Sequence, residues 1–524
     1  MSVFFVYLHF EKVDYKRFKY VIMMLNTRRI HASRWGFAVL LAGLWLAAGA
    51  SVAEAQVEVK RYAENRKSSA SLVGEGQLVG WHAGMSCWVG GARGGRTQVV
   101  WMDSTMTTVR QTVVPVDKDC RLLSAAEVGG EVRLLFELQP DRKHTAVYAA
   151  RVGFDTAAAS RRDTVLLVDT FTYQRKDRCL VWAAASPNGR YQAVVSVVEL
   201  HSEGGKYVAR VRLLDEGMQS LWTKEYALQS IDHVAVTDRG EVVTLGHEWV
   251  EDANHVLYNI ASKNREDAYD VVVEGMPIVG LQLVGVAGRH VMAMGTIVPM
   301  QRRVDTSECA GVIGLAFDID EVSLSVAARR FEAEDLYMLT NKKGGSRLRG
   351  QTVEYGSLLS TTLMPWGAVA ALGCNYAQSK TENNGTTTAI YYRRGIHLVA
   401  VDTAGEVRWV CNLRRNDVQK KSADLLRVAV VPVGDRVWLL RSEHKKMPSP
   451  MEKVKPAKTL KMGGKSHLAL YQVGEDGGAD RLLLEQNTKH SLLRAAADGR
   501  GRVAIFTAKG KRLRMMAAWP AEVH

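Results

Sequence analysis

The sequence predicts an all-β fold, a β-propeller whose four-stranded blades stack around a ring. Three observations lead to this prediction. One phrase, an apolar strand, a glycine turn and a second apolar strand, recurs at eight places along the chain. A second and more polar pair of strands follows each copy, and the last copy is one strand short. Repeats of about 40 to 50 residues are typical of propeller blades.

The repeated phrase is clearest in ASPNGRYQAVVSV at residues 185–197 and VAVTDRGEVVTLG at residues 234–246. Tight hairpin turns require a positive φ, which glycine adopts without steric cost. We therefore expect one glycine-cornered hairpin per blade and eight blades in all, with seven as the alternative because the first copy is degenerate. The eight turn glycines are Gly84, Gly130, Gly189, Gly240, Gly288, Gly367, Gly434 and Gly501.

The strand pattern also predicts how the ring closes. Inner strands should be apolar on both faces and outer strands partly solvated, and the first and second hairpins of each repeat show this gradient. The final repeat offers three strands, at 491–497, 502–507 and 512–519. The segment QVEVKRY at 56–62 is predicted to supply the fourth strand, which would remove two exposed edges. Two β-sandwich domains are the alternative fold, although they do not explain the repeats.

The first 55 residues are predicted to be an export signal. Basic residues precede the apolar run 35–50, and residues 53–55 read Ala-Glu-Ala, an A-x-A cleavage site. A retained anchor is the alternative, although the run is shorter than the roughly 18 residues of a membrane span. The polar stretch before Met24 indicates a true start near that methionine. Residues 56–524 should then form one exported domain, periplasmic or at the cell surface, without a membrane span.

Two long steps between repeats predict insertions, at about 332–356 and 442–467. The first contains EAEDLYMLTNKKG, the best helix candidate in the chain, whose apolar residues would dock against the propeller. The second is rich in lysine and proline and poor in apolar residues. Such a composition favours a disordered segment or a long exposed loop.

Charge and cysteine content limit the function only weakly. The chain has 69 Lys and Arg against 55 Asp and Glu, a net charge of +14. A basic surface attracts acidic polysaccharide, lipopolysaccharide or nucleic acid. The basic residues are spread along the chain, however, so no specific nucleic-acid site is predicted. The six cysteines are far apart and lack a C-x-x-C pair, so most are interpreted as buried thiols in strands.

Residues 335–443 carry a resemblance to a known family. They include EDLYMLTNKKGG, ENNGTTTAIYYRRGIHLVAVDTAGEVRWVCNLRRNDVQ and AVVPVGDRVWLL, in which Tyr391 and Tyr392 precede a D-x-x-G-x-x-x-W hairpin at 402–409. In these residues the chain resembles an uncharacterised family of exported bacterial β-propeller-like proteins of quinoprotein-like or WD-repeat-like architecture. The resemblance implies the fold and export, and no activity. Trp409 is expected to dock one blade on the next, and no cofactor is predicted.

No linear motif for catalysis or metal binding meets its requirements. GGKSH from residue 463 lacks the glycine that a phosphate loop needs upstream, and no G-x-S-x-G elbow occurs. GHEWVEDANH is not the zinc-protease motif H-E-x-x-H, so no metal site is predicted there. No catalytic residue is predicted either. The acidic and histidine residues of that segment are His247, Glu248, Glu251, Asp252 and His255.

Two clusters are predicted to bind a ligand. The first combines planar rings with guanidinium groups, which bind sugars or peptides at low entropic cost, and an ordinary strand is its alternative. The second would contact anionic polymers of the envelope, or would only solubilise its loop. The first cluster is Tyr391, Tyr392, Arg393 and Arg394. The second is Lys445, Lys446, Lys453, Lys455 and Lys458.

Taken together, these features favour a monomeric, non-catalytic propeller that binds a protein or glycan partner in the cell envelope. The leading alternative is a polysaccharide hydrolase or lyase whose carboxylates, drawn from several blades, meet in the central channel. Catalytic carboxylate pairs are defined by their separation in space, so their absence from any linear motif leaves the enzyme alternative open. A quinone-dependent dehydrogenase is a third hypothesis.

Overall fold

The computed structural model describes residues 57–62, 72, 76–90, 96–154, 166–173, 178–200, 206–228, 231–250, 253–274, 277–298, 308–331, 353–354, 356–381, 386–420, 423–445, 460–462, 465–498, 501–510 and 512–521. The predicted export signal and the helix candidate at 332–344 lie outside these residues. The chain divides into a large unit, Val59–Trp519, and a small one, Met1–Glu58 with Pro520–His524. In the small unit only residues 57–58 and 520–521 are described.

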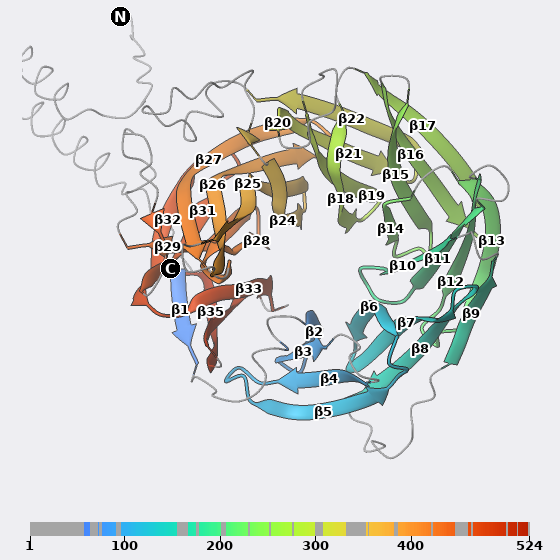
Figure 1. Ribbon diagram of the computed structural model, residues 1–524, viewed down its shortest axis with the longest axis horizontal. Helices are drawn as coiled ribbons and strands as arrows, with labels where there is room; N and C mark the ends of the chain where they lie inside the picture. The colour runs from blue at the N-terminus through green and yellow to red at the C-terminus, as the bar shows by residue number, and fades with distance from the viewer. Residues whose placement is uncertain are drawn as a thin grey trace, which may run out of the picture. The chain divides into compact units, whose positions relative to one another are not determined.

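Within Val59–Trp519, antiparallel sheets follow one another in chain order around a ring (Figure 1). The strands of the first four blades, each from the centre outward, are β2 (Gln77–His82), β3 (Met85–Val89), β4 (Arg96–Met102) and β5 (Thr108–Pro115); β6 (Arg121–Val128), β7 (Glu131–Asp141), β8 (His144–Gly153) and β9 (Leu166–Thr172); β10 (Arg178–Ala185), β11 (Gln192–Leu200), β12 (Lys206–Leu214) and β13 (Ser220–Leu228); and β14 (His233–Val236), β15 (Val242–Val250), β16 (Ala253–Ser262) and β17 (Arg265–Glu274).

The remaining blades repeat this order. Their strands are β18 (Ile278–Ala287), β19 (His290–Ile297), β21 (Gly311–Asp318) and β22 (Ser323–Arg330); β24 (Gly356–Met364), β25 (Gly367–Thr381), β26 (Thr387–Asp402) and β27 (Val407–Lys420); β28 (Val428–Val433), β29 (Arg436–His444), β31 (Ser466–Val473) and β32 (Ala479–Thr488); and β33 (Ser491–Ala497), β34 (Val503–Lys509) and β35 (Arg512–Pro520) with β1 (Val57–Arg61). Two short strands, β20 (Glu308–Cys309) and β23 (Val353–Glu354), pair with each other, and β30 (Leu460–Lys461) joins the edge of blade six.

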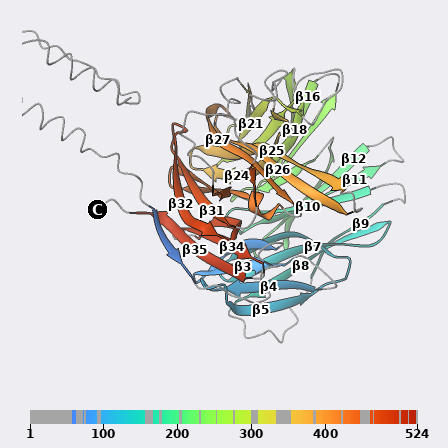
Figure 2. The same ribbon diagram turned by 60° about the vertical axis from the view of Figure 1, so that its left-hand side comes forward.

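The predicted closure of the ring by the N-terminal strand is confirmed. The last sheet has the order β1-β35-β34-β33, so β1 is its outermost strand (Figure 2). Tyr62 N donates to Met515 O at 3.2 Å, and the Arg61 guanidinium donates to Leu484 O of blade seven at 2.6 Å. The count is therefore eight blades, with the last one built from both ends of the chain.

All eight predicted turn glycines have positive φ, between +59° and +155°. Gly189, at φ +69°, shows why the residue is needed, because a Cβ there would lie 2.0 Å from Val128 Cγ2 of the preceding blade. Gly434, at φ +60°, has nothing within 4 Å of the same position. The glycines thus serve the turn everywhere, and in some blades also the contact with the neighbouring blade.

This difference gives a test of the turn geometry. We expect Gly434→Ala to lower the free energy of unfolding by about 1–2 kcal/mol, the cost of a left-handed residue with a Cβ. Gly189→Ala should lose more, since Val128 must also move. Chemical denaturation of the two variants measures the difference. Equal losses of unfolding free energy in the two variants would mean that Val128 moves at no energetic cost and that its close approach to Gly189 is unimportant.

The apolar core lies between neighbouring blades. Trp409 of β27 is buried and packs with β29 and β31 of the next blade. A Cβ on Gly477, in the turn after β31, would lie 3.3 Å from Trp409 Cβ. The tryptophan therefore docks blade six on blade seven, as expected. The cysteines with described side chains are buried and form no disulfide: Cys87, Cys120, Cys179, Cys309 and Cys411.

The antiparallel order of the blades defines two faces of the ring. In each blade the connection from the second to the third strand, and the connection to the next blade, emerge on one face. We call this the insertion face, because the β29–β31 connection that carries the lysine-rich segment belongs to it. The turns with the eight glycines emerge on the opposite face. No helix in the described part of the chain is both long and apolar enough to cross a bilayer.

Candidate functional site

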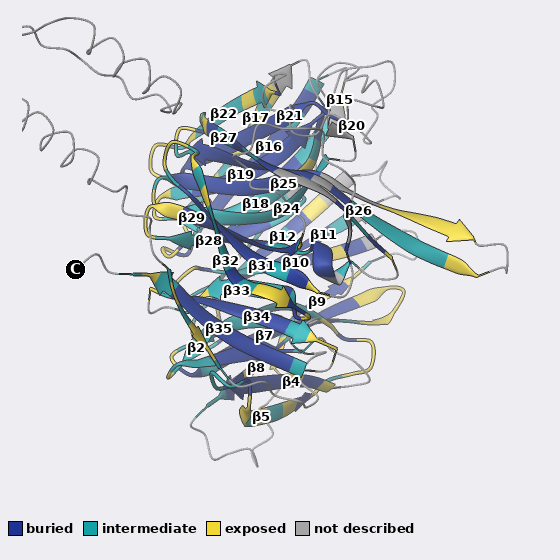
Figure 3. Ribbon diagram, turned by 90° about the vertical axis from the view of Figure 1, so that its left-hand side faces the viewer, coloured by how far each residue is buried: buried dark blue, intermediate teal, exposed yellow. Residues whose placement is uncertain are grey.

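The most distinctive feature of the insertion face is a hairpin that projects from blade six. β25 and β26 have 15 and 16 residues, and Figure 3 shows their ends extending well beyond the neighbouring strands. β24 pairs with β25 only as far as Gly356↔Cys374. From Asn375 to Thr381, β25 pairs with β26 alone among the described strands. Among the described strands, this edge of the hairpin therefore has no hydrogen-bonded partner, although the short strand β23 lies near β25.

The other edge of the hairpin is supported. β27 follows β26 out to the pair Ile390↔Lys420, and β30 adds a parallel strand through Asp417↔Leu460. Threonine, isoleucine and tyrosine dominate residues 387–392, and β-branched and aromatic residues favour such a pleated surface. The end of the lysine-rich segment is thus fastened to blade six, although the segment leaves from blade seven.

The structure separates the predicted tyrosine and arginine cluster. Tyr391 is half-buried and packs against Leu425, Leu426 and Met462, so its ring anchors the hairpin. Leu425 and Leu426 belong to the short 3-10 turn η4 (Asp424–Leu426), which lies between β27 and β28.

The other members of the cluster differ in exposure. Tyr392 is half-buried, and Arg393 is only 8% exposed. The side chain of Arg394 lies outside the described residues. An external ligand would therefore meet Tyr392 and the hairpin edge, and it would not reach Arg393 without rearrangement.

The predicted lysine cluster is described only at its start. Lys445 is exposed and directly follows β29. Lys446, Lys453, Lys455 and Lys458 lie outside the described residues. The predicted bounds of this insertion, 442–467, need correction, because residues 442–444 complete β29 and residues 466–467 begin β31. The strands that flank it, β29 and β31, pair through Glu443↔His467, so the described residues on either side of the segment lie at the insertion face.

A buried ionic network lies in blade seven, next to the base of the hairpin. Glu443 is 0% exposed and accepts hydrogen bonds from Arg441 Nε at 2.8 Å and Arg481 Nη2 at 2.5 Å. The Tyr471 hydroxyl also donates to Glu443, and it accepts from Arg441 Nη2 at 2.6 Å. Every oxygen of this carboxylate is therefore occupied by a donor.

The electrostatics of the network indicate a structural role. Burial raises the pKa of Glu443, but the charges of Arg441 and Arg481 and the hydrogen bonds from Tyr471 and Arg481 outweigh it and hold the pKa below its usual range. A general acid needs the opposite shift. The network thus supplies a rigid, ionised anchor under the insertion face. Sequence reasoning missed it, although charged residues inside the apolar strand VWLLRSEH are its signal.

The central channel does not gather carboxylates from the inner strands. Among β2, β6, β10, β14, β18, β24, β28 and β33, all of them described, the single carboxylate is Glu127. Its side chain is largely buried and accepts a hydrogen bond from Gly130 N at 2.7 Å. Glu127 therefore stabilises its own hairpin turn, and these strands offer no pair of acids for glycoside hydrolysis.

The acidic and histidine residues of the GHEWVEDANH segment do not converge. His247 lies opposite Val256, whereas His255 lies opposite Glu248, so the two histidines are on opposite faces of the sheet. His247 Nδ1 lies 2.5 Å from Asp232, and His255 Nδ1 lies 2.9 Å from Asp270. Glu251 and Asp252 are outside the described residues. No metal-sized cluster of such side chains occurs in the described chain.

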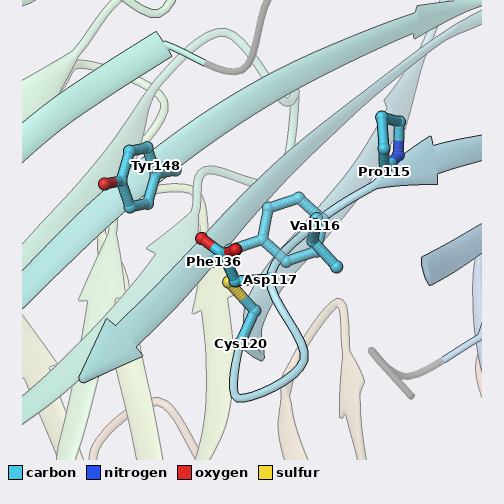
Figure 4. A pocket seen from close by; sticks show the side chains of 6 residues that line it. All are labelled: Pro115, Val116, Asp117, Cys120, Phe136 and Tyr148. Carbon is cyan, nitrogen blue, oxygen red and sulfur yellow. The ribbon is translucent and has the colours of Figure 1, made fainter. Parts of the chain in front are cut away.

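A cleft of about 360 Å³ opens on the insertion side of blades one and two (Figure 4). Cys120 lies beside Asp117 and Phe136 in it, and Tyr148 and Pro115 line its periphery. Burial raises the pKa of the Cys120 thiol, and the nearby acids Asp117 and Asp119 add to this, although a backbone hydrogen bond opposes it. A protonated thiol is a poor nucleophile. The Cys120 thiol therefore does not show the lowered pKa that is typical of a catalytic cysteine.

Comparison with known proteins agrees with the fold and goes no further. No family model and no curated protein matches the chain. Solved structures with similar architecture include the Dos1 propeller, at TM-score 0.40 and 8% identity over 88% of this chain and 95% of that one. The WD40 domain of SCAP from fission yeast has a TM-score of 0.38 and 9% identity over 90% of this chain and 97% of that one. The polysaccharide lyase Uly1 has a TM-score of 0.34 and 9% identity over 76% of this chain and 90% of that one. The chain is similar to these proteins in its propeller fold alone.

Proposed function

We propose that this protein is a non-catalytic binding module, exported to the cell envelope, that holds a protein or glycan partner on its insertion face. The observation that carries the proposal is the projecting β25–β26 hairpin, whose edge at Asn375–Thr381 has no strand partner among the described residues. Natural proteins usually cover or charge such an edge. An edge left open on a rigid support is a typical site for the addition of a strand from a partner.

The surroundings of the hairpin support this proposal. Tyr391 packs against Leu425, Leu426 and Met462 at the base of the hairpin, so the edge is presented without a large ordering cost. Residues 377–381 are exposed and polar apart from Ala377, which suits reversible binding better than permanent association. We therefore favour an extended polypeptide as the partner. The alternative, a polysaccharide hydrolase or lyase, is not favoured by the carboxylate content of the inner strands.

A shortened hairpin tests the proposal. Replacing residues 379–389 by Asn-Gly joins Gln378 to Ile390, which already pair, through a two-residue turn. The propeller should fold as before, since the described residues among those removed, 379–381 and 386–389, are exposed or half-buried. Pull-down from envelope extracts should then lose the partners that the full chain enriches. A glycan array on the same two proteins distinguishes a sugar partner.

Two outcomes would contradict the proposal. One is an identical set of partners for the full and shortened chains, which would place binding elsewhere. The other is an absence of any enriched partner together with a silent glycan array. Circular dichroism and thermal unfolding of the shortened chain serve as the folding control.

A further inference from the structure

Three exposed lysines lie at the insertion-face ends of neighbouring strands in blade seven. Strands β29, β31 and β32 run side by side in this blade (Figure 1). Their outermost residue pairs at this end are His444↔Ser466 and Ser466↔Thr488. In each strand the next residue beyond these pairs is an exposed lysine. We call these three residues the lysine row: Lys445, Lys465 and Lys489.

The members of the lysine row are close in space but not in sequence. Neighbouring strands are about 4.8 Å apart, so the three backbones span about 10 Å. Lys445 begins the predicted lysine cluster, whereas Lys489 lies in the connection from blade seven to blade eight. Only the order of the strands brings these two residues together, and the row was therefore not apparent from the sequence.

The strands that carry the lysine row are held together by the buried network. Glu443 of β29 accepts hydrogen bonds from Tyr471 of β31 and Arg481 of β32. Each of the three strands therefore contributes a member to the network, and Glu443 is two residues before Lys445. The lysine backbones are fixed before a ligand arrives, so binding needs to order only their side chains.

The carboxylates of these strands near the insertion face are engaged by arginines. Glu443 is fully buried and pairs with two arginines of its own blade, and Glu485 pairs with Arg514 of blade eight. The residues that connect β29 to β31 do not compensate the lysines either. Their segment 446–459 contains four lysines and one acid, so it adds net positive charge to the same end of the blade.

We propose that the lysine row binds the phosphate groups of a linear polyanion without nucleobases, at the insertion face of blade seven. An ammonium group is a compact point charge with three donors, and phosphate oxygens can approach it from any side. Three such charges within about 10 Å can neutralise successive phosphates of one chain, and each neutralised phosphate releases a bound counterion. The inference goes beyond the proposed function, because the row and the hairpin edge belong to different blades.

The composition of the row favours phosphate over other anionic ligands. A planar carboxylate is matched best by the forked donors of arginine, and the row contains no arginine. Single-stranded nucleic acids stack their bases on aromatic rings, whereas the exposed residues just before Lys489 are Gln486 and Asn487. The row therefore offers charge without a platform for a flat ring.

Calorimetry with inorganic polyphosphate as the probe tests this proposal. The probe is titrated into the full chain at several salt concentrations. The triple variant Lys445→Gln, Lys465→Gln, Lys489→Gln should lower the affinity at low salt roughly tenfold or more. Its slope of log K against log salt concentration should also be shallower by about 2 to 3, because each phosphate contact contributes about 0.7 to 0.9 to that slope.

A second triple variant controls for the total charge of the protein. Lys118→Gln, Lys143→Gln and Lys263→Gln remove the same charge from exposed lysines of the first four blades. This control should bind polyphosphate as the unmodified chain does. Both triple variants should keep the melting temperature of the unmodified chain, since the replaced side chains are exposed. An equal loss of affinity in the two variants would mean that polyphosphate responds only to net charge, and it would overturn the proposal.

The remaining outcomes separate this inference from the proposed function. The chain with the shortened hairpin should still bind polyphosphate, because it keeps the lysine row. Loss of binding in that chain would place the polyanion on the hairpin, and it would overturn the inference, as would an absence of binding by the unmodified chain. If polygalacturonate or oligothymidylate binds more tightly than polyphosphate and depends on the row, the ligand is an acidic glycan or a nucleic acid and the assignment is wrong. None of these results changes which partners the hairpin edge enriches.

Discussion

Glu443→Gln is expected to lower the free energy of unfolding by about 3–5 kcal/mol, the usual cost of removing one partner from a buried ion pair. The glutamine keeps the volume of the side chain but leaves Arg441 and Arg481 without the carboxylate that they share. Glu443 is fully buried, so water cannot replace the lost charge. Chemical denaturation, followed by tryptophan fluorescence, measures the change.

Glu216→Gln is the matched control for this prediction. Glu216 pairs with Arg190 at 3.0 Å, but both side chains are more than half exposed. Exposed ion pairs contribute about 0–1 kcal/mol, so this variant should be close to the unmodified protein. Similar losses in the two variants would show that the blade-seven network contributes no more than a surface pair.

The same network predicts a dependence on pH. The pKa of Glu443 is lower in the folded protein than its ordinary value of 4.5, so its ionised form stabilises the fold above that value. This contribution should decrease as the pH falls below about 4.5 and through the folded-state pKa. The difference in unfolding free energy between the unmodified chain and Glu443→Gln should therefore narrow in acid. A constant difference down to strongly acidic pH would contradict the assignment.

Phe506→Ala is expected to cost about 3–5 kcal/mol and to weaken the closure of the ring specifically. Phe506 is fully buried in β34 of the last blade, and its ring meets Trp88 of the first blade edge-on, with centroids 5.1 Å apart. Met102 and Met106 of blade one complete this contact. The cavity left by alanine would thus lie at the junction between the first and last blades.

Phe317→Ala is the control for closure. Phe317 is equally buried in blade five and contacts Tyr258 of blade four, with ring centroids 4.1 Å apart. Both variants should lose a similar amount of stability. Hydrogen exchange should rise in β1, β2 and β35 only for Phe506→Ala, because this junction is where the ring opens. A uniform rise in both variants would mean that closure has no separate weakness.

The sequence indicated one part of the projecting hairpin, residues 391–394, but not its unpaired edge at Asn375–Thr381. The segment at 391–394 was singled out for its rings and guanidinium groups, and it does lie on the projecting hairpin. Whether each side chain faces outward depends on η4 and β30, which approach from later in the chain. Tyr391 packs against them, whereas the next residue, Tyr392, lies on the other face of the strand. A strand pattern shows which residues share a face of the sheet, but it does not show which later segments of the chain pack on that face.

The sequence by itself determined the eight blades, the inner and outer strands and the closing strand at 57–61. These features depend on local requirements, namely a positive φ at each turn and apolar residues wherever two blades meet. The same residue pattern therefore recurs in every repeat. Only the tertiary structure decided where the charges lie. Glu443 takes Arg481 as a partner from 38 residues away, and Arg514 takes Glu485 from 29 residues away. The partner of a buried charge is set by distance in space and by desolvation, and neither quantity is written in the order of residues along the chain.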